Sequence, residues 1–406
     1  MVKGMRIAVV SIHGCPEVRL GHKDTGGMNA VLLQTVTRLG KLGIKVDIFT
    51  RFHGFQSARE VILSPNVTVI HLMNTSTGLT KEEIYNQSEQ FIAEIDLYKV
   101  KNNFIYDVIH VHYWLSASIG LSLAKSWTVP LVAQFHTLAD AKIRSMTEVM
   151  DPPLRNVVEK NTMHQADKIL AASNDEMASI EFIDRNVHTK LELVPYGVDI
   201  SVFHPVNSSV ARSRLGLNGH PLIVYAGRID PIKGIDLLLQ SVACMKIREN
   251  AELIVIGGGD LEFDEYLNYL HNLTQELGIS QRVHFVDAMD QQLLMYYFNA
   301  ADVCVVPSRY ESFGLVALEA MACGTPVIAR KVGGLQSLVK HGMTGYLVPW
   351  HCPEPIANQL EVILENDLLR KKMGYHAESW AKTWTWESTV EQLNNVYKEI
   401  TCHSVD

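Results

Sequence analysis

Short apolar runs alternate with segments of helical periodicity along the first half of the chain. Between residues 29 and 42, apolar residues recur at the spacing of an amphipathic helix, and a second helix is expected over Ser116–Ala124. The apolar runs predict β-strands at Arg6–Val10, Lys45–Phe49, Val67–His71, Tyr106–Val111, Pro130–Phe135 and Lys168–Ala172. Strands that alternate with helices indicate a parallel sheet covered by helices on both faces, and such sheets bind ligands at the carboxyl ends of their strands.

The same pattern starts again after residue 220. A helix is expected over Asp236–Met245, and strands are expected at Pro221–Ala226, Glu252–Gly257, Arg282–Val286, Val303–Pro307 and Thr325–Ala329. Pro205 and the following Asn207-Ser208-Ser209 indicate a linker. We therefore expect two α/β domains, residues 1–203 and 204–384, each of a common domain size. The remaining residues, 385–406, contain a further helix at Glu387–Ile400.

The composition is that of an ordinary globular protein, with 406 residues of which 47% are hydrophobic and 20% charged. The formal net charge of −8 argues against general binding to nucleic acid or anionic membranes. The first apolar run, Ile7–Val10, is too short for a signal-peptide core, and no run approaches the roughly 20 residues that span a bilayer. These features predict a cytoplasmic protein without stable membrane insertion. The six scattered cysteines predict reduced thiols, and the 17 histidines show no ligand spacing, so we expect no metal site.

Two glycine-containing loops follow predicted strands. The turn Asp24-Thr25-Gly26-Gly27 lies between the first strand and the first helix, where backbone amides can approach an anion or a sugar. A tight turn that needs positive φ explains this pair of glycines equally well. The second loop, Gly227–Gly234, carries Arg228 and Lys233 after the first strand of the second half. A guanidinium fork and a compact ammonium suit a diphosphate. Two exposed basic residues on a loop are the alternative, but the position after a strand end favours the diphosphate site.

Two glutamates stand eight positions apart near the end of the second half. Glu311 follows the strand Val303–Pro307, and we expect Glu319 two turns into the next helix. The helix start around Phe313–Val316 would direct backbone amides toward an anion. Carboxylates can accept hydrogen bonds from sugar hydroxyls, so Glu319 suits a ribose and Glu311 a transferred sugar. A favourable interaction with the helix dipole explains Glu311 as well, but it does not explain Glu319 among apolar neighbours.

Together these segments resemble the family-4 retaining glycosyltransferases of the GT-B fold. The resemblance rests on Gly26-Gly27-Met28-Asn29, the loop Gly227–Gly234, the pair Glu311 and Glu319, and the sequel Ala322-Cys323-Gly324-Thr325-Pro326, and it extends from Arg6 to about Lys398. It implies two facing Rossmann-like domains with parallel sheets and a deep interdomain cleft. The N-terminal domain would bind the acceptor and the C-terminal domain the nucleotide sugar. The last helix would cross back to the N-terminal domain.

The resemblance also implies roles for individual residues. Arg228 and Lys233 would neutralise the leaving diphosphate, so that neither a metal ion nor another cofactor is required, and His136 would contact the donor sugar near the reacting carbon. Glu311 would bind the donor sugar and Glu319 the ribose. Backbone amides would contact the donor at the glycine turn, from Gly26 and Gly27, and at the helix start, from Gly314, Leu315 and Val316. In this family, retention is assigned to front-face attack, which needs no enzyme nucleophile.

Within the family, the N-terminal half is most similar to the transferases that join N-acetylglucosamine to inositol phosphate in the mycothiol pathway. In that subgroup the acceptor phosphate is held at positions that correspond here to Lys81, Tyr113, Thr137 and Arg155, and Asn29 would meet an acceptor hydroxyl. Sucrose-phosphate synthases are the second nearest subgroup. Their glycine turn is usually followed by Gln, whereas Met28 stands here.

The expected reaction is transfer of a hexose or N-acetylhexosamine from a nucleoside-diphosphate sugar, with uridine as the favoured base, to a small phosphorylated acceptor. Transfer to fructose or fructose 6-phosphate, and transfer to a lipid or polysaccharide, are alternatives. A nucleotide-sugar epimerase or a binding regulator is the alternative outside the transferases. A homodimer is compatible with the sequence.

Overall fold

The computed structural model describes residues 4–17, 26–54, 58–73, 78–145, 151–217, 219–246, 250–258 and 265–402. These residues divide into two compact units. Unit 1 contains the described residues of 4–17, 27–195 and 387–402, and unit 2 contains Gly26 and the described residues of 196–386. The predicted segment Asp24-Thr25 lies outside the described residues. The domain boundary that we expected at 203 lies eight residues after this division.

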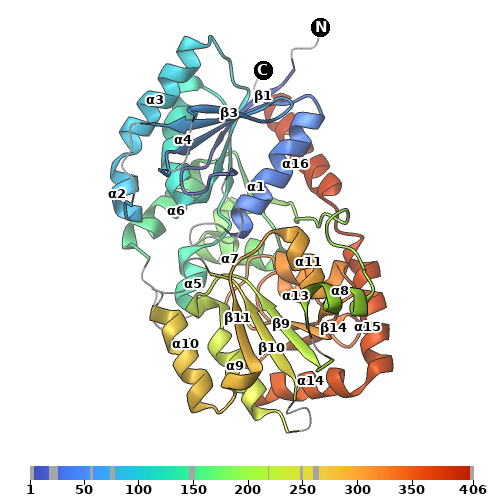
Figure 1. Ribbon diagram of the computed structural model, residues 1–406. Helices are drawn as coiled ribbons and strands as arrows, with labels where there is room; N and C mark the ends of the chain where they lie inside the picture. Colours follow the sequence, from blue (N-terminus) through green and yellow to red (C-terminus); the bar gives the residue numbers. More distant parts are fainter. Residues whose placement is uncertain are drawn as a thin grey trace. The chain divides into compact units, whose positions relative to one another are not determined.

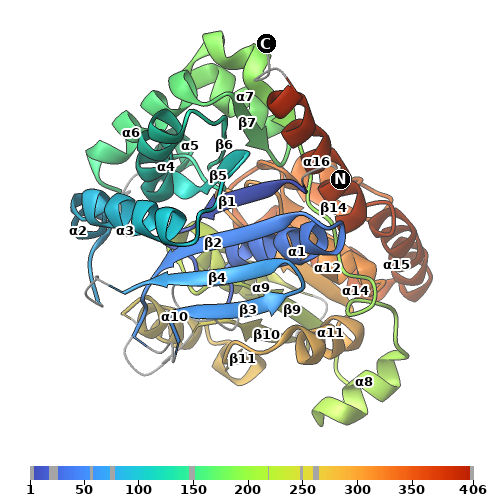
Figure 2. The ribbon, with the colours of Figure 1, turned by 90° about the horizontal axis from the view of Figure 1, so that it is seen from above.

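Unit 1 is built on an eight-stranded sheet with the order β3-β4-β2-β1-β5-β6-β7-β8. The strands are β1 (Arg6–Val10), β2 (Lys45–Arg51), β3 (Glu60–Ser64), β4 (Val67–Leu72), β5 (Val108–His112), β6 (Leu131–Gln134), β7 (Lys168–Ala171) and β8 (Leu191–Leu193). All neighbours pair in parallel except β3, which is antiparallel to β4. Figure 2 shows β1, β2, β4 and β3 side by side. The sheet therefore has the expected parallel character, with one antiparallel edge strand.

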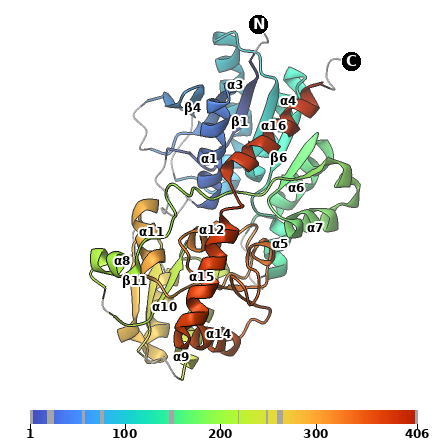
Figure 3. The same cartoon turned by 90° about the vertical axis from the view of Figure 1, so that its right-hand side faces the viewer.

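The helices of unit 1 connect these strands. They are α1 (Gly27–Lys41), α2 (Lys81–Asn86), α3 (Ser88–Lys101), α4 (Tyr113–Trp127), α5 (Ala139–Ser145), α6 (Pro153–Gln165), α7 (Asn174–Ile183) and the 3-10 helix η1 (Arg185–Lys190). The last helix of the chain, α16 (Trp386–Cys402), lies beside α1 and β1 (Figure 3). Its apolar residues Val390, Leu393 and Tyr397 are buried in the same core as Ile7. This C-terminal helix therefore forms part of unit 1, although it follows all of unit 2 in the chain.

Unit 2 is built on a six-stranded sheet with the order β11-β10-β9-β12-β13-β14. Figure 1 labels β11, β10, β9 and β14 of this sheet. The strands are β9 (Leu222–Ala226), β10 (Glu252–Ile256), β11 (Val283–Val286), β12 (Val303–Val306), β13 (Val327–Arg330) and β14 (Gly345–Val348), and every pairing is parallel. Five of these strands coincide with predicted ones, because their residues are almost continuously apolar. The sixth, β14, was not predicted, since it begins at a glycine.

The helices of unit 2 pack on this sheet. They are α8 (Ser208–Leu215), η2 (Pro231–Lys233), α9 (Ile235–Cys244), α10 (Glu265–Glu276), η4 (Ser280–Arg282), α11 (Gln291–Ala300), α12 (Leu315–Ala322), α13 (Leu335–Leu338), α14 (Pro353–Glu365) and α15 (Asp367–Ala381). Their apolar faces bury residues such as Leu238, Leu270 and Leu360 against Ile223 and Val255 of the strands. Each unit is thus an α/β sheet whose strands end at one edge, the edge where ligands bind in such folds.

Candidate functional site

Two residues of unit 1 have an unusual backbone at the carboxyl ends of neighbouring strands. Tyr113 follows β5 with φ 71°, and His136 follows β6 with φ 61°. Residues other than glycine rarely adopt this left-handed conformation, which costs of order 1–3 kcal/mol and is concentrated at functional sites. The two strands are direct neighbours. Two predicted site residues with strained backbones therefore lie at the ends of adjacent strands, on the ligand-binding edge of the sheet.

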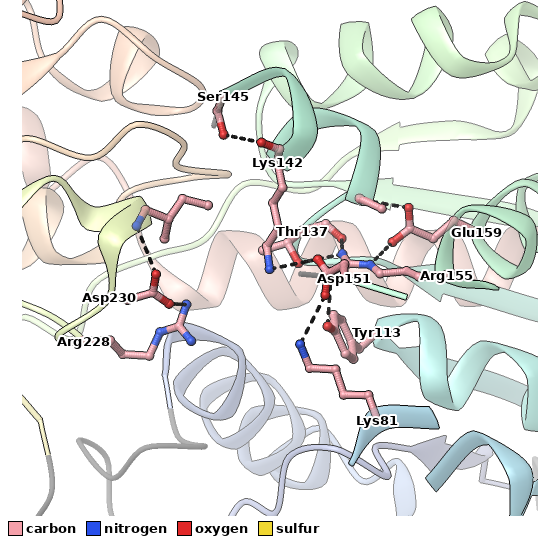
Figure 4. A network of polar contacts seen from close by, with 12 residues as sticks. Lys81, Tyr113, Thr137, Lys142, Ser145, Asp151, Arg155, Glu159, Arg228 and Asp230 are labelled. Atoms are coloured by element: carbon pink, nitrogen blue, oxygen red, sulfur yellow. Dashed lines mark hydrogen bonds and ion pairs between the residues drawn. The ribbon is translucent and has the colours of Figure 1, made fainter. Parts of the chain in front are cut away.

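Arg155 lies at the centre of a polar cluster on unit 1 (Figure 4). Its side chain is 0% exposed, and it enters from the first turn of α6. Its Nη1 donates to the Tyr113 hydroxyl at 3.2 Å, and its Nη2 donates to Thr137 O at 2.6 Å and Thr137 Oγ1 at 3.0 Å. Its Nε donates to Glu159 Oε1 at 2.6 Å. The buried guanidinium of Arg155 thus contacts two of the other three residues that were predicted to hold the acceptor phosphate, Tyr113 and Thr137.

The fourth predicted residue, Lys81, reaches the same cluster through a carboxylate. Its Nζ lies 3.3 Å from Asp151 Oδ1, and Asp151 Oδ2 lies 2.7 Å from Arg155 Nη1. A further cation, Lys142 of α5, lies 3.3 Å from the same Oδ2. Asp151 and Lys142 were not predicted. Lys81 begins α2, whose capping box is formed by Thr80, so it is both a helix-start residue and a member of the cluster.

The charges of the cluster shift the pKa values of its members. Burial would raise the pKa of Asp151, but Arg155, Lys142 and Lys81 together hold it below 3.8. Burial and the nearby Arg155 lower the pKa of Lys142, while Asp151 opposes this shift. The carboxylate is therefore ionised at neutral pH. A group of cations that already holds one buried anion has the chemistry of a phosphate site.

His136 belongs to a row of buried imidazoles in unit 1. Its Nε2 lies 2.8 Å from His112 Nδ1, and His110 Nδ1 lies 2.7 Å from the Tyr397 hydroxyl of α16. Burial lowers the pKa of His112 to about 3, and burial together with His112 lowers the pKa of His136 far below its usual range. His136 is therefore a neutral imidazole at physiological pH. Such a ring offers hydrogen bonds to a sugar without carrying charge.

Asn29 and Gly27 lie in the first turn of α1. The Asn29 side chain is buried, and its Nδ2 donates to Cys15 O at 3.2 Å. Its Oδ1 has no hydrogen-bond partner among the described residues. A Cβ at Gly14 would lie 2.3 Å from this oxygen, so a larger residue at position 14 would require the Asn29 side chain to shift.

The predicted diphosphate loop of unit 2 starts at the end of β9. Gly227 has φ 152°, and a Cβ at Gly257 would lie 1.7 Å from Gly227 O, so two chain segments approach each other closely here. Arg228 is 44% exposed, and its Nη2 lies 3.5 Å from Asp230 Oδ2 (Figure 4). Asp230 also caps η2 by accepting from Ile232 N at 3.0 Å. Arg228 is therefore loosely held and accessible.

Lys233, at the end of η2, is paired with the first of the two predicted glutamates. Its Nζ lies 2.7 Å from Glu311 Oε2, which also accepts from the Ser308 hydroxyl at 3.3 Å. The loop is fixed because Arg309 N donates to Ile232 O at 2.8 Å. Gly234 follows with φ 69°, and a Cβ there would lie 2.4 Å from Pro307 O. The structure thus brings together a cation and a carboxylate that are 78 positions apart.

The second glutamate lies nearer to the helix start than we expected. Gly314, with φ 107°, is the N-cap of α12, so Leu315 and Val316 are its first residues. Glu319 is therefore one turn, not two, into the helix, because the chain before Gly314 is a loop. Burial raises the pKa of Glu319 to about 8, and its Oε1 accepts from Gln291 Nε2 at 3.4 Å. At pH 7 this carboxyl is largely protonated.

One group of potential metal ligands was missed by the sequence analysis. Within the part of the chain that the structure describes, Cys15, Glu17 and His71 bring their ligand atoms within 4.8 Å of one another. His71 Nδ1 lies 2.9 Å from Ala58 O, and its Nε2 lies 2.9 Å from Glu17 Oε2 and 3.6 Å from Cys15 Sγ. Each ring nitrogen of His71 thus has an oxygen atom within hydrogen-bond distance. These contacts account for the geometry, and we assign no metal to the group.

Comparisons with known proteins identify the family. The profile of Glycosyltransferase Family 4 matches residues 25–202, and that of Glycosyl transferases group 1 matches residues 209–380. A relative from Kribbella flavida, named D-inositol 3-phosphate glycosyltransferase, is 37% identical over 98% of this chain and 96% of its own length. The chain belongs to glycosyltransferase family 4. A relative of the same name from Corynebacterium efficiens is 35% identical over 99% of this chain and 97% of its own.

Solved structures agree with this assignment. A sucrose-phosphate synthase from Thermosynechococcus elongatus superposes with a TM-score of 0.91 at 32% identity, covering 98% of this chain and 100% of that chain. The fold of this glycosyltransferase is therefore GT-B, with two Rossmann-like domains, as the sequence led us to expect. None of the helices in the described ranges is long and apolar enough to cross a membrane.

Proposed function

We propose that this glycosyltransferase moves a hexose or N-acetylhexosamine from a uridine-diphosphate sugar to a small phosphorylated polyol, with inositol phosphate as the first candidate, and that the anomeric configuration is retained. The observation that carries the proposal is the basic cluster of unit 1, in which Lys81, Lys142 and Arg155 surround one carboxylate. Two full-length relatives named D-inositol 3-phosphate glycosyltransferase support the choice of acceptor.

The acceptor would bind to unit 1 through its phosphate. Lys81 supplies an accessible ammonium, with a side chain that is 36% exposed, while Arg155 is buried and fixes the hydroxyls of Tyr113 and Thr137. Each hydroxyl oxygen accepts a hydrogen bond from Arg155, and its O–H group can still donate to a phosphate oxygen. Asn29 Oδ1, which is buried without a partner in the described structure, would accept a hydrogen bond from an acceptor hydroxyl.

The donor would be held mainly by unit 2. Arg228 and Lys233 would neutralise the diphosphate as it leaves, and the amides of Gly314, Leu315 and Val316 at the start of α12 would contact phosphate or sugar. Glu319 would bind the ribose, where a protonated carboxyl can donate to one hydroxyl and accept from another. Glu311 would bind the transferred sugar, and the glycine turn at Gly26 and Gly27 would approach the donor.

The chemistry needs stabilisation of charge on the leaving phosphate more than it needs a nucleophile. Arg228 and Lys233 would supply that stabilisation without a metal ion. In front-face attack, the acceptor hydroxyl forms the new glycosidic bond on the side from which the diphosphate departs. The acceptor proton passes to the departing phosphate oxygen. His136, neutral and held by His112, would hydrogen-bond to the donor sugar beside the reacting carbon.

A second candidate is transfer to fructose 6-phosphate, which the TM-score of 0.91 to a sucrose-phosphate synthase supports. A matrix of donors and acceptors separates the two. Uridine, guanosine and adenosine diphosphate sugars are each combined with inositol phosphate, fructose 6-phosphate and their unphosphorylated counterparts, and acceptor-dependent release of nucleoside diphosphate is measured. Inositol phosphate with a uridine donor should give the highest kcat/KM.

A matched pair of variants tests the acceptor site itself. Lys81→Ala should raise the KM for the phosphorylated acceptor at least tenfold, whereas Lys125→Ala, an exposed lysine in the last turn of α4, should not change it. Activity with unphosphorylated acceptors alone would refute the proposed acceptor class. Release of diphosphate that never depends on an acceptor would argue for a binding protein or an epimerase instead.

A further inference from the structure

Asp151 lies among the three cations of the basic cluster of unit 1. Its carboxylate is 5% exposed and lies against three cations, at 2.7 Å from Arg155 Nη1 and 3.3 Å from each of Lys81 Nζ and Lys142 Nζ. The cations come from three different helices, α2, α5 and α6, and they converge on this one group (Figure 4). Asp151 itself lies two residues before α6.

The carboxylates of the cluster do not balance its cations, even with Asp151 in place. Glu159 is fully committed, because its Oε1 accepts from Arg155 Nε at 2.6 Å and its Oε2 accepts from Ala139 N at 3.0 Å. Arg155 and Glu159 therefore balance each other in a buried pair. Two ammonium groups, those of Lys81 and Lys142, remain for one carboxylate. A phosphate monoester carries a charge of about −1.5 to −2 at pH 7, which matches two ammonium groups better than one carboxylate does.

We propose that Lys142 binds the acceptor phosphate together with Lys81, and that the Asp151 carboxylate holds the phosphate position in the free protein and is displaced when the acceptor binds. The inference rests on the proposed function, since it requires a phosphorylated acceptor at this cluster. A phosphate and a carboxylate cannot share the same ammonium groups at contact distance, because two like charges would then lie close together in a poorly solvated site. Asp151 is therefore an internal competitor, and it weakens the binding of every anion that lacks further contacts.

The alternative is that Asp151 only orients the two lysines and stays in place when phosphate binds. The two interpretations predict opposite effects of Asp151→Asn. If the Asp151 carboxylate competes with phosphate for the lysines, removing its charge should make phosphate bind more tightly. If it only orients the lysines, removing its charge should leave them unoriented, and phosphate should bind more weakly. The amide keeps the size of the side chain and can still accept from Arg155, which favours a folded variant.

The test measures the dissociation constant of inorganic phosphate by calorimetry and the KM of the phosphorylated acceptor by nucleoside diphosphate release. In Asp151→Asn we expect both to fall at least tenfold. Asp140→Asn is the matched control, because Asp140 is a half-exposed acid on α5 that pairs with Arg144 outside the cluster, and both constants should stay within twofold. A rise of either constant in Asp151→Asn would overturn the role of Asp151 as a competitor.

Lys142→Gln gives an independent result, because it does not touch the buried Arg155–Glu159 pair. We expect a folded Lys142→Gln protein to bind inorganic phosphate at least tenfold more weakly, and unchanged binding would overturn the role of Lys142. Lys81→Ala separates this inference from the proposed function. If Lys81→Ala weakens phosphate binding while Asp151→Asn also weakens it, the phosphate site stands and the competitor is refuted. If no variant changes phosphate binding, the phosphate site itself is refuted.

Discussion

Replacing Lys233 by alanine should lower kcat strongly while changing the free energy of unfolding only slightly. Lys233 and Glu311 form an ion pair of 2.7 Å whose side chains are 20% and 17% exposed. Water can reach both groups, and Glu311 keeps the Ser308 hydroxyl as a hydrogen-bond donor after the change. The net loss of unfolding free energy should therefore be about 1 kcal/mol or less, as for other solvated ion pairs. For a unit of this size, that corresponds to a Tm shift of about 2–4 °C.

The effect on turnover should be much larger. If Lys233 carries charge stabilisation of the leaving diphosphate, its removal should lower kcat about 10²–10³-fold, or about 2.7–4 kcal/mol of transition-state stabilisation. The assay is nucleoside diphosphate release at saturating donor and acceptor, beside a thermal melt of the same preparation. Lys382→Ala is the control, because Lys382 forms a comparable ion pair with Glu378 in unit 2 with a side chain that is 54% exposed. A folded Lys233→Ala protein with kcat within threefold of the unchanged enzyme would refute the assignment.

Three further predictions concern single groups. Arg155→Met should lower the free energy of unfolding by about 3–5 kcal/mol in urea titrations, because it leaves Glu159 buried without its cation and removes one of the three cations around Asp151; a loss below about 1 kcal/mol would show that water readily replaces the guanidinium. The pKa of Glu319 is raised from 4.5 to about 8, so the native state binds a proton that the unfolded state has lost, and stability from this group falls as pH rises between these values. Glu319→Gln should therefore flatten the decline in Tm between pH 5 and pH 8, and an unchanged pH profile would contradict the pKa shift. Treatment with EDTA should leave turnover unchanged, and a loss of activity that zinc or magnesium restores would contradict the metal-independent mechanism.

The fold could be predicted largely because its central strands are apolar on both faces. β1 and β9 have no polar positions in their centres, so short apolar runs identified them directly. The strands that were missed lie at the edges of the sheets. β3 is partly exposed along its whole length, and β8 has only three residues. Their sequences carry little signal because neighbouring strands cover only one side of them.

The candidate site was predicted in part, and the missed residues share a physical reason. Motifs indicated Arg228, Lys233 and Glu319 from their spacing within one loop or helix. The positive φ angles of Tyr113 and His136 follow from tertiary packing and leave no local pattern. Of the partners of Asp151, Arg155 is four positions away and Lys142 nine, whereas Lys81 is 70 positions away on α2. No spacing rule could have joined Lys81 to the other two cations before the fold was known.

Both units hold candidate anion-binding cations in ion pairs with internal carboxylates. In unit 1, Asp151 lies against Lys81 and Lys142, and in unit 2, Glu311 lies against Lys233. A half-buried ammonium without an anion would lose hydration without compensation, so such a pair stabilises the ligand-free protein. To displace the carboxylate from the ammonium group, a ligand must carry more negative charge than one carboxylate does. A diphosphate and a phosphate monoester both satisfy this requirement, whereas neutral sugars do not, and the pairing therefore favours substrates that carry phosphate on both the donor and the acceptor side.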